Sequence, residues 1–195
     1  GYPEDVNSHY CMAKKMLIVQ GDAYYNQYGL RSQTLLFTNL YGPKDHFNKN
    51  RSHVVPALIT KFHEAIKNNG STVTLWGDGT PTRDLLYVED AADAIMCALY
   101  ARDTTSPVIN IGSGKEISIK ELSETIKSIM GGNFEIRWDK SKPNGDPRRI
   151  LDISRAKKEL GFKVKISLRE GLKRTIDWYR LQLNKYVNNQ IKESL

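Results

Sequence analysis

Residues 33–43 read Gln-Thr-Leu-Leu-Phe-Thr-Asn-Leu-Tyr-Gly-Pro, and this stretch decides the fold class. Residues 33–37 form a short apolar run rich in β-formers, which is typical of a buried parallel strand. Residues 38–43 end that strand sharply, and we expect a polar loop to follow through Arg51. In open α/β sheets, ligands bind beyond the carboxyl ends of the strands, so this junction is the first candidate for a site.

Predicted strands and helices alternate on both sides of this stretch. A loop over 1–6 leads to a helix that Asn7 or Ser8 can cap and that runs to Tyr28, just before Gly29. Further helices are expected over 54–67, 89–101, 118–130, 154–160 and from 167 onward, and further strands over 72–76, 83–88, 108–111 and 134–138. This alternation predicts the α/β class with a mainly parallel sheet.

Several helix ends carry local signals. Ser118 with Glu121, and Ser167 with Glu170, each match the pattern of a capping box, and Ser154 can cap the short helix between them. The first helix is more apolar than a one-sided surface helix needs, with Met12, Met16, Ile18, Val19, Ala23 and Tyr24. It is either a helix buried on two sides, for example at a dimer interface, or an internal core helix.

Composition excludes several classes of protein. The 195 residues contain 39% apolar and 26% charged residues, which is typical of a globular chain rather than a disordered one. No apolar run approaches the ~20 residues of a membrane-spanning helix. Two cysteines, Cys11 and Cys97, match no metal or redox spacing, so we predict a reducing compartment, the cytoplasm, and no metal.

The net charge of +7 favours anionic ligands without indicating a nucleic-acid partner. Lysines and arginines are scattered, and no basic run is interleaved with aromatic residues. The largest local basic group comprises Lys140, Lys142, Arg148 and Arg149. It suits a phosphate-bearing small molecule as well as a polymer.

Tyr10 and Lys14 are the first candidate catalytic pair. A spacing of four places both side chains on one helix face, one turn apart. An ammonium near the phenol favours the phenolate, as a tyrosine needs in order to exchange a proton with a sugar or alcohol oxygen. The alternative is an amphipathic helix with one solvated lysine, because this spacing is common by chance.

The chain contains no glycine-rich turn of the Gly-x-Gly-x-x-Gly type between a strand and a helix. Residues 112–114 (Gly-Ser-Gly) follow a strand but are too short for that fingerprint. We interpret them as a turn that lets the backbone come close to a ligand or to a neighbouring segment.

Taken in order, the motifs resemble the GDP-L-fucose synthase family of extended short-chain dehydrogenases/reductases. They are Tyr10-x-x-x-Lys14, Thr-Asn-Leu-Tyr-Gly-Pro (38–43), Ser-His-Val-Val-Pro-Ala (52–57), Trp-Gly-Asp-Gly (76–79), Arg-Asp-Leu-Leu-Tyr-Val (83–88), Asn-Ile-Gly-Ser-Gly (110–114) and Lys-Pro-Asn-Gly-Asp-Pro-Arg-Arg (142–149). Residues 39–56 carry the most specific part, since the wider superfamily shares several of the others. The family epimerises C3 and C5 of GDP-4-keto-6-deoxy-mannose and reduces C4 with NADPH.

The resemblance implies roles for the catalytic and cofactor-binding candidates. Tyr10 would protonate the C4 oxygen, and Lys14 would hold the nicotinamide ribose. His53 would be one of two acid/base groups acting at C3 and C5, and it would lie beside the cofactor. A helix N-terminus disfavours imidazolium, which suits a neutral base. Asn39 and the adjoining Leu40 would contact cofactor or sugar.

The resemblance also implies substrate contacts. Arg83 and Lys142, with Arg149 as a weaker candidate, would neutralise the diphosphate. Lys61 stands where relatives usually carry arginine, so it keeps the charge without the planar fork. Trp76 would pack on the sugar nucleotide or be a buried strand tryptophan. Asp152 is expected to be a helix-start carboxylate.

The family's cofactor glycines, catalytic serine and second acid/base cysteine precede Tyr10-x-x-x-Lys14 and fall outside this chain. The chain therefore looks like the carboxyl-terminal half of such an enzyme, and we expect it to be inactive alone. Residues 1–51 and 88–112 would be the last elements of a Rossmann-type NAD(P)-binding domain. Residues 52–87 and 113–195 would form a smaller α/β substrate domain. The family expectation is a homodimer through the Tyr10 helix.

Two alternatives remain. One keeps the fold and changes the substrate, as in another NAD(P)-dependent epimerase, reductase or dehydratase acting on a nucleotide sugar. The other is a non-catalytic module that binds a sugar nucleotide.

Overall fold

A computed structural model describes residues 8–48, 52–101, 104 and 107–193. Its elements are, in order, α1 (Ser8–Tyr28), β1 (Thr34–Phe37), β2 (Asn39–Tyr41), α2 (Val54–Lys67), β3 (Thr72–Trp76), β4 (Thr82–Tyr87), α3 (Val88–Tyr100), β5 (Val108–Ile111), β6 (Glu116–Ser118), α4 (Ile119–Met130), β7 (Glu135–Asp139), β8 (Arg148–Arg149), α5 (Ser154–Leu160) and α6 (Leu168–Glu193). The predicted loop over 1–6, the candidate cap Asn7 and the loop end at Arg51 lie outside the described residues.

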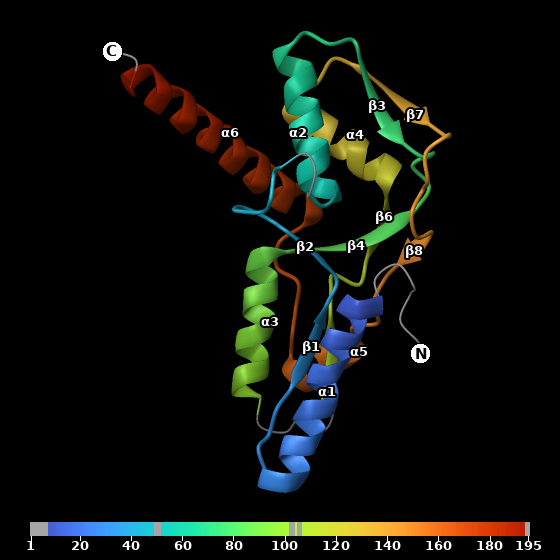
Figure 1. Ribbon diagram of the computed structural model, residues 1–195, viewed down its shortest axis with the longest axis vertical. Coiled ribbons are helices and arrows are strands. Elements are labelled where there is room, and N and C mark those ends of the chain that lie inside the picture. Colours follow the sequence, from blue (N-terminus) through green and yellow to red (C-terminus); the bar gives the residue numbers. More distant parts are fainter. Residues whose placement is uncertain (1–7, 49–51, 102–103, 105–106, 194–195) are drawn as a thin grey trace.

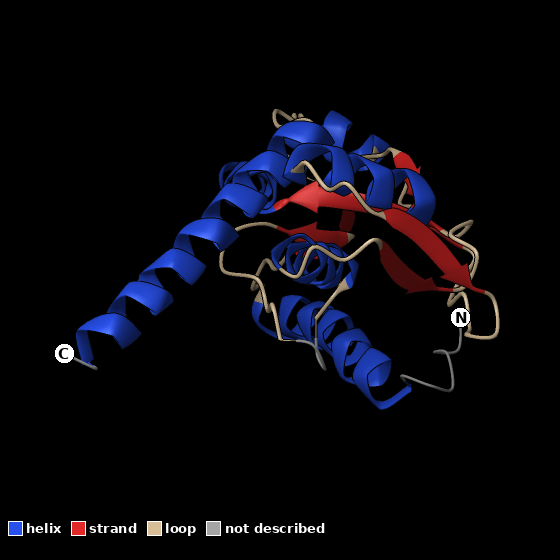
Figure 2. Ribbon diagram, turned by 90° about the horizontal axis from the view of Figure 1, so that it is seen from above, coloured by secondary structure: helices blue, strands red, loops and turns tan. Residues whose placement is uncertain are grey.

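Parallel pairing dominates the strands. β1 pairs with β5, β2 with β4, and β3 with β7, all in parallel. β4 is the central strand, because it also pairs with β6 in antiparallel and with β8 in parallel orientation. The predicted α/β class with a mainly parallel sheet is confirmed. Figure 2 shows the strands as a layer with helices on both sides.

The expected loop after β1 is wrong for Asn39–Tyr41, which forms β2. Thr38 separates the two strands and redirects the chain: its N–H donates to the carbonyl of Ile111 at 2.9 Å, and its hydroxyl donates to the carbonyl of Asp84 at 2.8 Å. These bonds move the chain from the edge of β5 to the edge of β4. The site at the end of β1 therefore stands on regular strand rather than on loop.

Two hydrophobic cores meet at β4, because successive strand side chains point to opposite faces. Leu85 and Tyr87 belong to the core formed with α2, β3, α4 and α6, while Leu86 belongs to the core formed with α3, β5 and α5. Figure 1 shows the first group of elements in the upper part of the view and the second in the lower part. The predicted domain division stays a prediction. Helix α5 falls in the predicted substrate domain, but it packs with α3 and β5, which fall in the predicted cofactor domain.

Helix α1 ends at Tyr28 and is followed by Gly29 with φ +67°, as predicted, but none of the helix residues is buried. Tyr10, Met16 and Tyr28 have 59%, 63% and 66% of their surface exposed. The prediction of an internal core helix is therefore wrong for the described chain. The apolar side chains of α1 remain available to another surface.

Helix ends follow the local signals in part. Ser118 and Glu121 form the complete predicted capping box of α4. At Ser167 only half of the box forms, because Glu170 pairs with Arg174 at 2.8 Å. Ser154 does not cap α5 but is its first residue; it donates to the Asp152 carboxylate from its N–H at 2.9 Å and from its hydroxyl at 2.6 Å. These bonds hold the pKa of Asp152 below its ordinary value and confirm the expected helix-start carboxylate.

Candidate functional site

A cavity of about 400 Å³ lies at the carboxyl end of β1. It is lined by Phe37, Thr38, Asn39, Arg148, Arg149, Ile150 and Leu151. Two predicted binding residues, Asn39 and Arg149, thus come together although they lie far apart in the sequence. The junction singled out by residues 33–43 borders a cavity, as expected for the end of a parallel strand.

Strand register brings a second pair of predicted residues together. Arg83 of β4 is the partner of Arg149 of β8 in a parallel ladder, so both side chains leave the same face. Asp146 lies against both: its carboxylate forms an ion pair with Arg149, and its carbonyl accepts from Arg83 Nη1 at 2.8 Å. Burial and the neighbouring Arg149 lower the pKa of Arg83, while Asp146 acts in the opposite direction. The arrangement is a positively charged pair suited to an anion.

Asp84, which the sequence reasoning did not single out, fixes the position of this strand. Its carboxylate is fully buried and accepts from Ser113 N at 2.9 Å, Ser113 Oγ at 2.6 Å and Gly114 N at 3.3 Å. A Cβ added at Gly112 would lie 2.5 Å from Asp84 Oδ2. The Gly-Ser-Gly turn therefore approaches a neighbouring segment, one of its two predicted partners. The glycines indicated a close approach of the backbone, but nothing in the sequence indicated that Asp84 is the group approached.

Trp76 and Lys142 lie at another corner, where β3 and β7 end. Trp76 is the register partner of Asp139, whose carbonyl accepts from Lys142 N at 3.2 Å. Trp76 is 64% exposed, so a buried strand tryptophan is wrong. Asn144 joins this corner to the Arg83 pair. Its side-chain oxygen accepts from Asp78 N at 2.8 Å. Asn144 also lies only two residues before Asp146, which contacts both arginines.

His53 and Lys61 belong to α2. His53 is the N-cap residue, its side chain makes no capping hydrogen bond, and both residues are exposed. The imidazole therefore stands at the helix N-terminus, as predicted. Neither side chain lines the cavity at the end of β1.

Tyr10 and Lys14 lie on one face of the first turns of α1, as predicted. Lys14 Nζ is 5.6 Å from the centroid of the Tyr10 ring, and Tyr10 is 59% exposed. In Figure 1, α1 descends from its first turn and β1 rises beside it. The pair thus occupies the end of α1 that faces the carboxyl end of β1.

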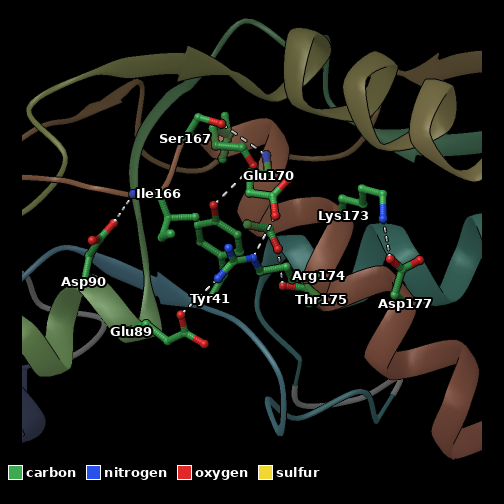
Figure 3. A network of polar contacts seen from close by, with 12 residues as sticks. Tyr41, Glu89, Asp90, Ile166, Ser167, Glu170, Lys173, Arg174, Thr175 and Asp177 are labelled. Carbon is green, nitrogen blue, oxygen red and sulfur yellow. Dashed lines mark hydrogen bonds and ion pairs between the residues drawn. The ribbon is translucent and has the colours of Figure 1, made fainter.

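A buried polar network holds β2, α3 and α6 together (Figure 3). The Tyr41 hydroxyl donates to the carbonyl of Leu168 at 3.3 Å, and burial raises the pKa of Tyr41, which keeps the phenol protonated. The buried Asp90 carboxylate accepts from Lys165 N at 3.0 Å and Ile166 N at 3.1 Å. Because Tyr41 lies two residues after Asn39, this network also fixes the strand that lines the cavity.

The structure thus assembles Asn39, Arg83 and Arg149 at neighbouring strand ends and leaves the other candidates on surrounding elements. Among the described residues, no group of histidine, cysteine or acidic side chains could hold a metal ion. In the same part of the chain, no helix is both long and apolar enough to cross a membrane.

Comparison with known proteins gives the chain its relatives. Residues 2–112 match the model of the NAD dependent epimerase/dehydratase family. The chain is 43% identical over 178 residues to a probable GDP-L-fucose synthase 1 of Oryza sativa subsp. japonica, covering 90% of this chain and 53% of the relative. It spans about half the length of the curated relatives it matches.

Two solved structures share the fold. A GDP-L-fucose synthetase from Naegleria fowleri bound to NADP has a TM-score of 0.84 and 26% identity, covering 94% of this chain and 59% of that one. A UDP-glucose 4-epimerase with UDP-glucose from Thermotoga maritima has a TM-score of 0.76 and 31% identity, covering 88% and 53%.

Proposed function

The chain belongs to the NAD dependent epimerase/dehydratase family, and from this premise we propose that it supplies the substrate side of a GDP-L-fucose synthase. The reaction is the NADPH-dependent conversion of GDP-4-keto-6-deoxy-mannose to GDP-L-fucose. The observation that carries the proposal is the side-by-side pair Arg83 and Arg149 next to the cavity lined by Asn39. Two planar guanidiniums on one face suit the adjacent phosphates of a nucleotide diphosphate.

Substrate contacts follow from the surrounding elements. Arg83 and Arg149 would bind the diphosphate, with Lys142 adding charge from the neighbouring corner. Trp76, exposed at that corner, would pack against the sugar nucleotide. Lys61, which is exposed on α2, would contact the substrate through its ammonium group. Residues 52–87 and 113–195 would then be the substrate domain, and 1–51 with 88–112 the end of the cofactor domain.

The residues at the end of β1 fit one end of a nicotinamide cofactor. Asn39 offers an amide in the half-buried wall of the cavity. Leu40 does not line the cavity and would contact the cofactor through its backbone. Tyr10 and Lys14 would hold the ribose, and His53 would lie next to it. Because the sequence has no glycine-rich dinucleotide turn, only the nicotinamide end fits here. When bound, NADPH would supply hydride.

Proton transfers would fall to side chains of this chain. Tyr10 would give its proton to the C4 oxygen, and Lys14 would stabilise the phenolate that remains. His53 would move protons at C3 and C5, which its exposed position at the helix N-terminus allows.

The apolar surface of α1 supports a homodimer through this helix, and the cysteine usage supports the cytoplasm.

Proton exchange separates the role of His53 from that of Tyr10. In the protein purified from its source cell, His53→Gln should abolish deuterium exchange at C3 and C5 while largely preserving reduction of an already epimerised substrate. The reduction step is the internal control for folding. Equal loss of both activities in a folded variant would contradict the assignment of His53.

One observation favours a different nucleotide sugar. The likeness to a UDP-glucose 4-epimerase extends over 88% of the chain. In the protein purified from its source cell, NADPH oxidation with GDP-4-keto-6-deoxy-mannose supports the main proposal, and a preference for a UDP-sugar supports this alternative. Binding of GDP-sugar without NADPH binding would indicate a non-catalytic binding module instead.

A further inference from the structure

Asp146 contacts the two arginines of the anion site through different groups. Arg83 Nη1 donates to two backbone carbonyls, those of Thr82 at 2.7 Å and Asp146 at 2.8 Å. Arg149 instead forms an ion pair with the Asp146 carboxylate. The backbone of Asp146 therefore positions one guanidinium, and its carboxylate neutralises the other.

The backbone around Asp146 is fixed while its carboxylate can move. Thr82 N donates to the carbonyl of Pro147 at 3.0 Å, and the Arg83 bond holds the carbonyl of Asp146 itself. The Arg149 and Asp146 side chains are 50% and 36% exposed. An ion pair at this exposure contributes little to stability, so a side-chain rotation can break it without opening the loop.

The neighbouring charges indicate that the Asp146 carboxylate acts on Arg83 and Arg149 and not on Arg148. Arg148, the other arginine of β8, leaves the opposite face and pairs with Glu116 at 2.6 Å. Asp146 opposes the effect of Arg149 on Arg83, so it compensates for the proximity of the two cations. A dianionic group arriving at Arg83 and Arg149 meets a carboxylate already in place.

We propose that the Asp146 carboxylate is an internal competitor for the diphosphate site. It occupies Arg149 when no ligand is bound and turns away when an anionic ligand binds, so Asp146 weakens and thereby sets the affinity for diphosphates. The proposal rests on the proposed function in assigning a nucleotide diphosphate to this arginine pair. No backbone rearrangement is required, because Arg83 keeps both carbonyl acceptors throughout.

Calorimetry with inorganic diphosphate tests the competition directly. Asp146→Asn should bind inorganic diphosphate about 2- to 5-fold more tightly than the unmodified chain at low ionic strength, the range that an exposed ion pair provides. Asp177→Asn is the matched control. It also adds one positive charge by breaking an exposed pair, with Lys173 at 2.8 Å, but on α6. It should bind diphosphate as the unmodified chain does.

Two further variants complete the test. Asp146→Ser replaces the asparagine variant if the latter does not fold, and it should show the same gain. Adding Arg149→Gln to either variant should remove the gain, because the competitor acts through that guanidinium. Equal or weaker diphosphate binding by a folded Asp146 variant, or binding by neither protein, overturns the proposal.

GDP-mannose, titrated into the same proteins, separates this inference from the proposed function. If diphosphate follows the expected pattern while GDP-mannose binds no better than diphosphate, the competition stands and the assignment to GDP-sugars fails. If GDP-mannose binds tightly and Asp146→Asn changes neither affinity, the function stands and the competition fails.

Discussion

Replacing Asp84 with asparagine should destabilise the fold more than any exposed charge substitution. The carboxylate is fully buried and accepts three hydrogen bonds from the turn at 113–114, at 2.6–3.3 Å. An asparagine has nearly the same shape but only one acceptor oxygen, and its amide group would face an N–H donor. At least one donor of the turn would then be buried without a partner.

The expected magnitude follows from these bonds. A hydrogen bond to a charged group contributes about 1.5–3 kcal/mol net. Asparagine keeps part of the interaction with Ser113, so we expect a loss of about 2–3 kcal/mol in the free energy of unfolding. For a chain of this size, that corresponds to a fall in Tm of roughly 4–12 °C.

Thermal unfolding followed by circular dichroism, with urea titration for the free energy, measures the effect. Asp177→Asn is the control, because an exposed i,i+4 pair contributes only about 0.3–0.5 kcal/mol. A double-mutant cycle adds a contact-specific test. Gly112→Ala should cost less in an Asp84→Ala background, since its Cβ would no longer meet Asp84 Oδ2. A loss at Asp84→Asn no larger than that of the control would refute the reasoning.

Two further predictions concern α5 and α6. Gly171→Ala would place a Cβ against the Tyr41 hydroxyl, so urea titration should show a loss of about 1–3 kcal/mol, partly restored by Tyr41→Phe. Asp152→Asn should lower Tm at neutral pH but not at about pH 2. The folded-state pKa of Asp152 lies below its unfolded value, so its contribution is present above the unfolded value and is lost as pH falls through the folded one. An unchanged Tm difference at both pH values would contradict this assignment.

The sequence was sufficient for features that depend on neighbours along the chain. The capping box at Ser118 forms because its partner Glu121 is one turn away. Tyr10 and Lys14 share a face because helix periodicity alone places them there. The family motifs add more, since residues 39–56 point to one enzyme family, and the comparisons with known proteins agree.

Features that depend on pairing across the chain were beyond local reasoning. Strand β2 has three residues, and only its partner β4 makes it a strand. Arg83 and Arg149 become neighbours through the register of β8, a strand of two residues, which is too short to leave a periodic pattern in the sequence. Tryptophan is a residue type often found in cores, but Trp76 is the last residue of β3 and is exposed there. The role of Asp84 depends on a turn 29 residues later.

The connection between β7 and β8 has a consequence for how the ligand that this chain binds can change during evolution. It is attached through Asn144 to Asp78 and through Asp146 to Arg83, whereas residues 140–143 are exposed. Mutations in that exposed segment can change the size and charge that a ligand meets without disturbing either core. Under the proposed function, selection for a different nucleotide sugar would therefore have a segment in which to act, while the strands that carry Asn39, Arg83 and Arg149 stay as they are.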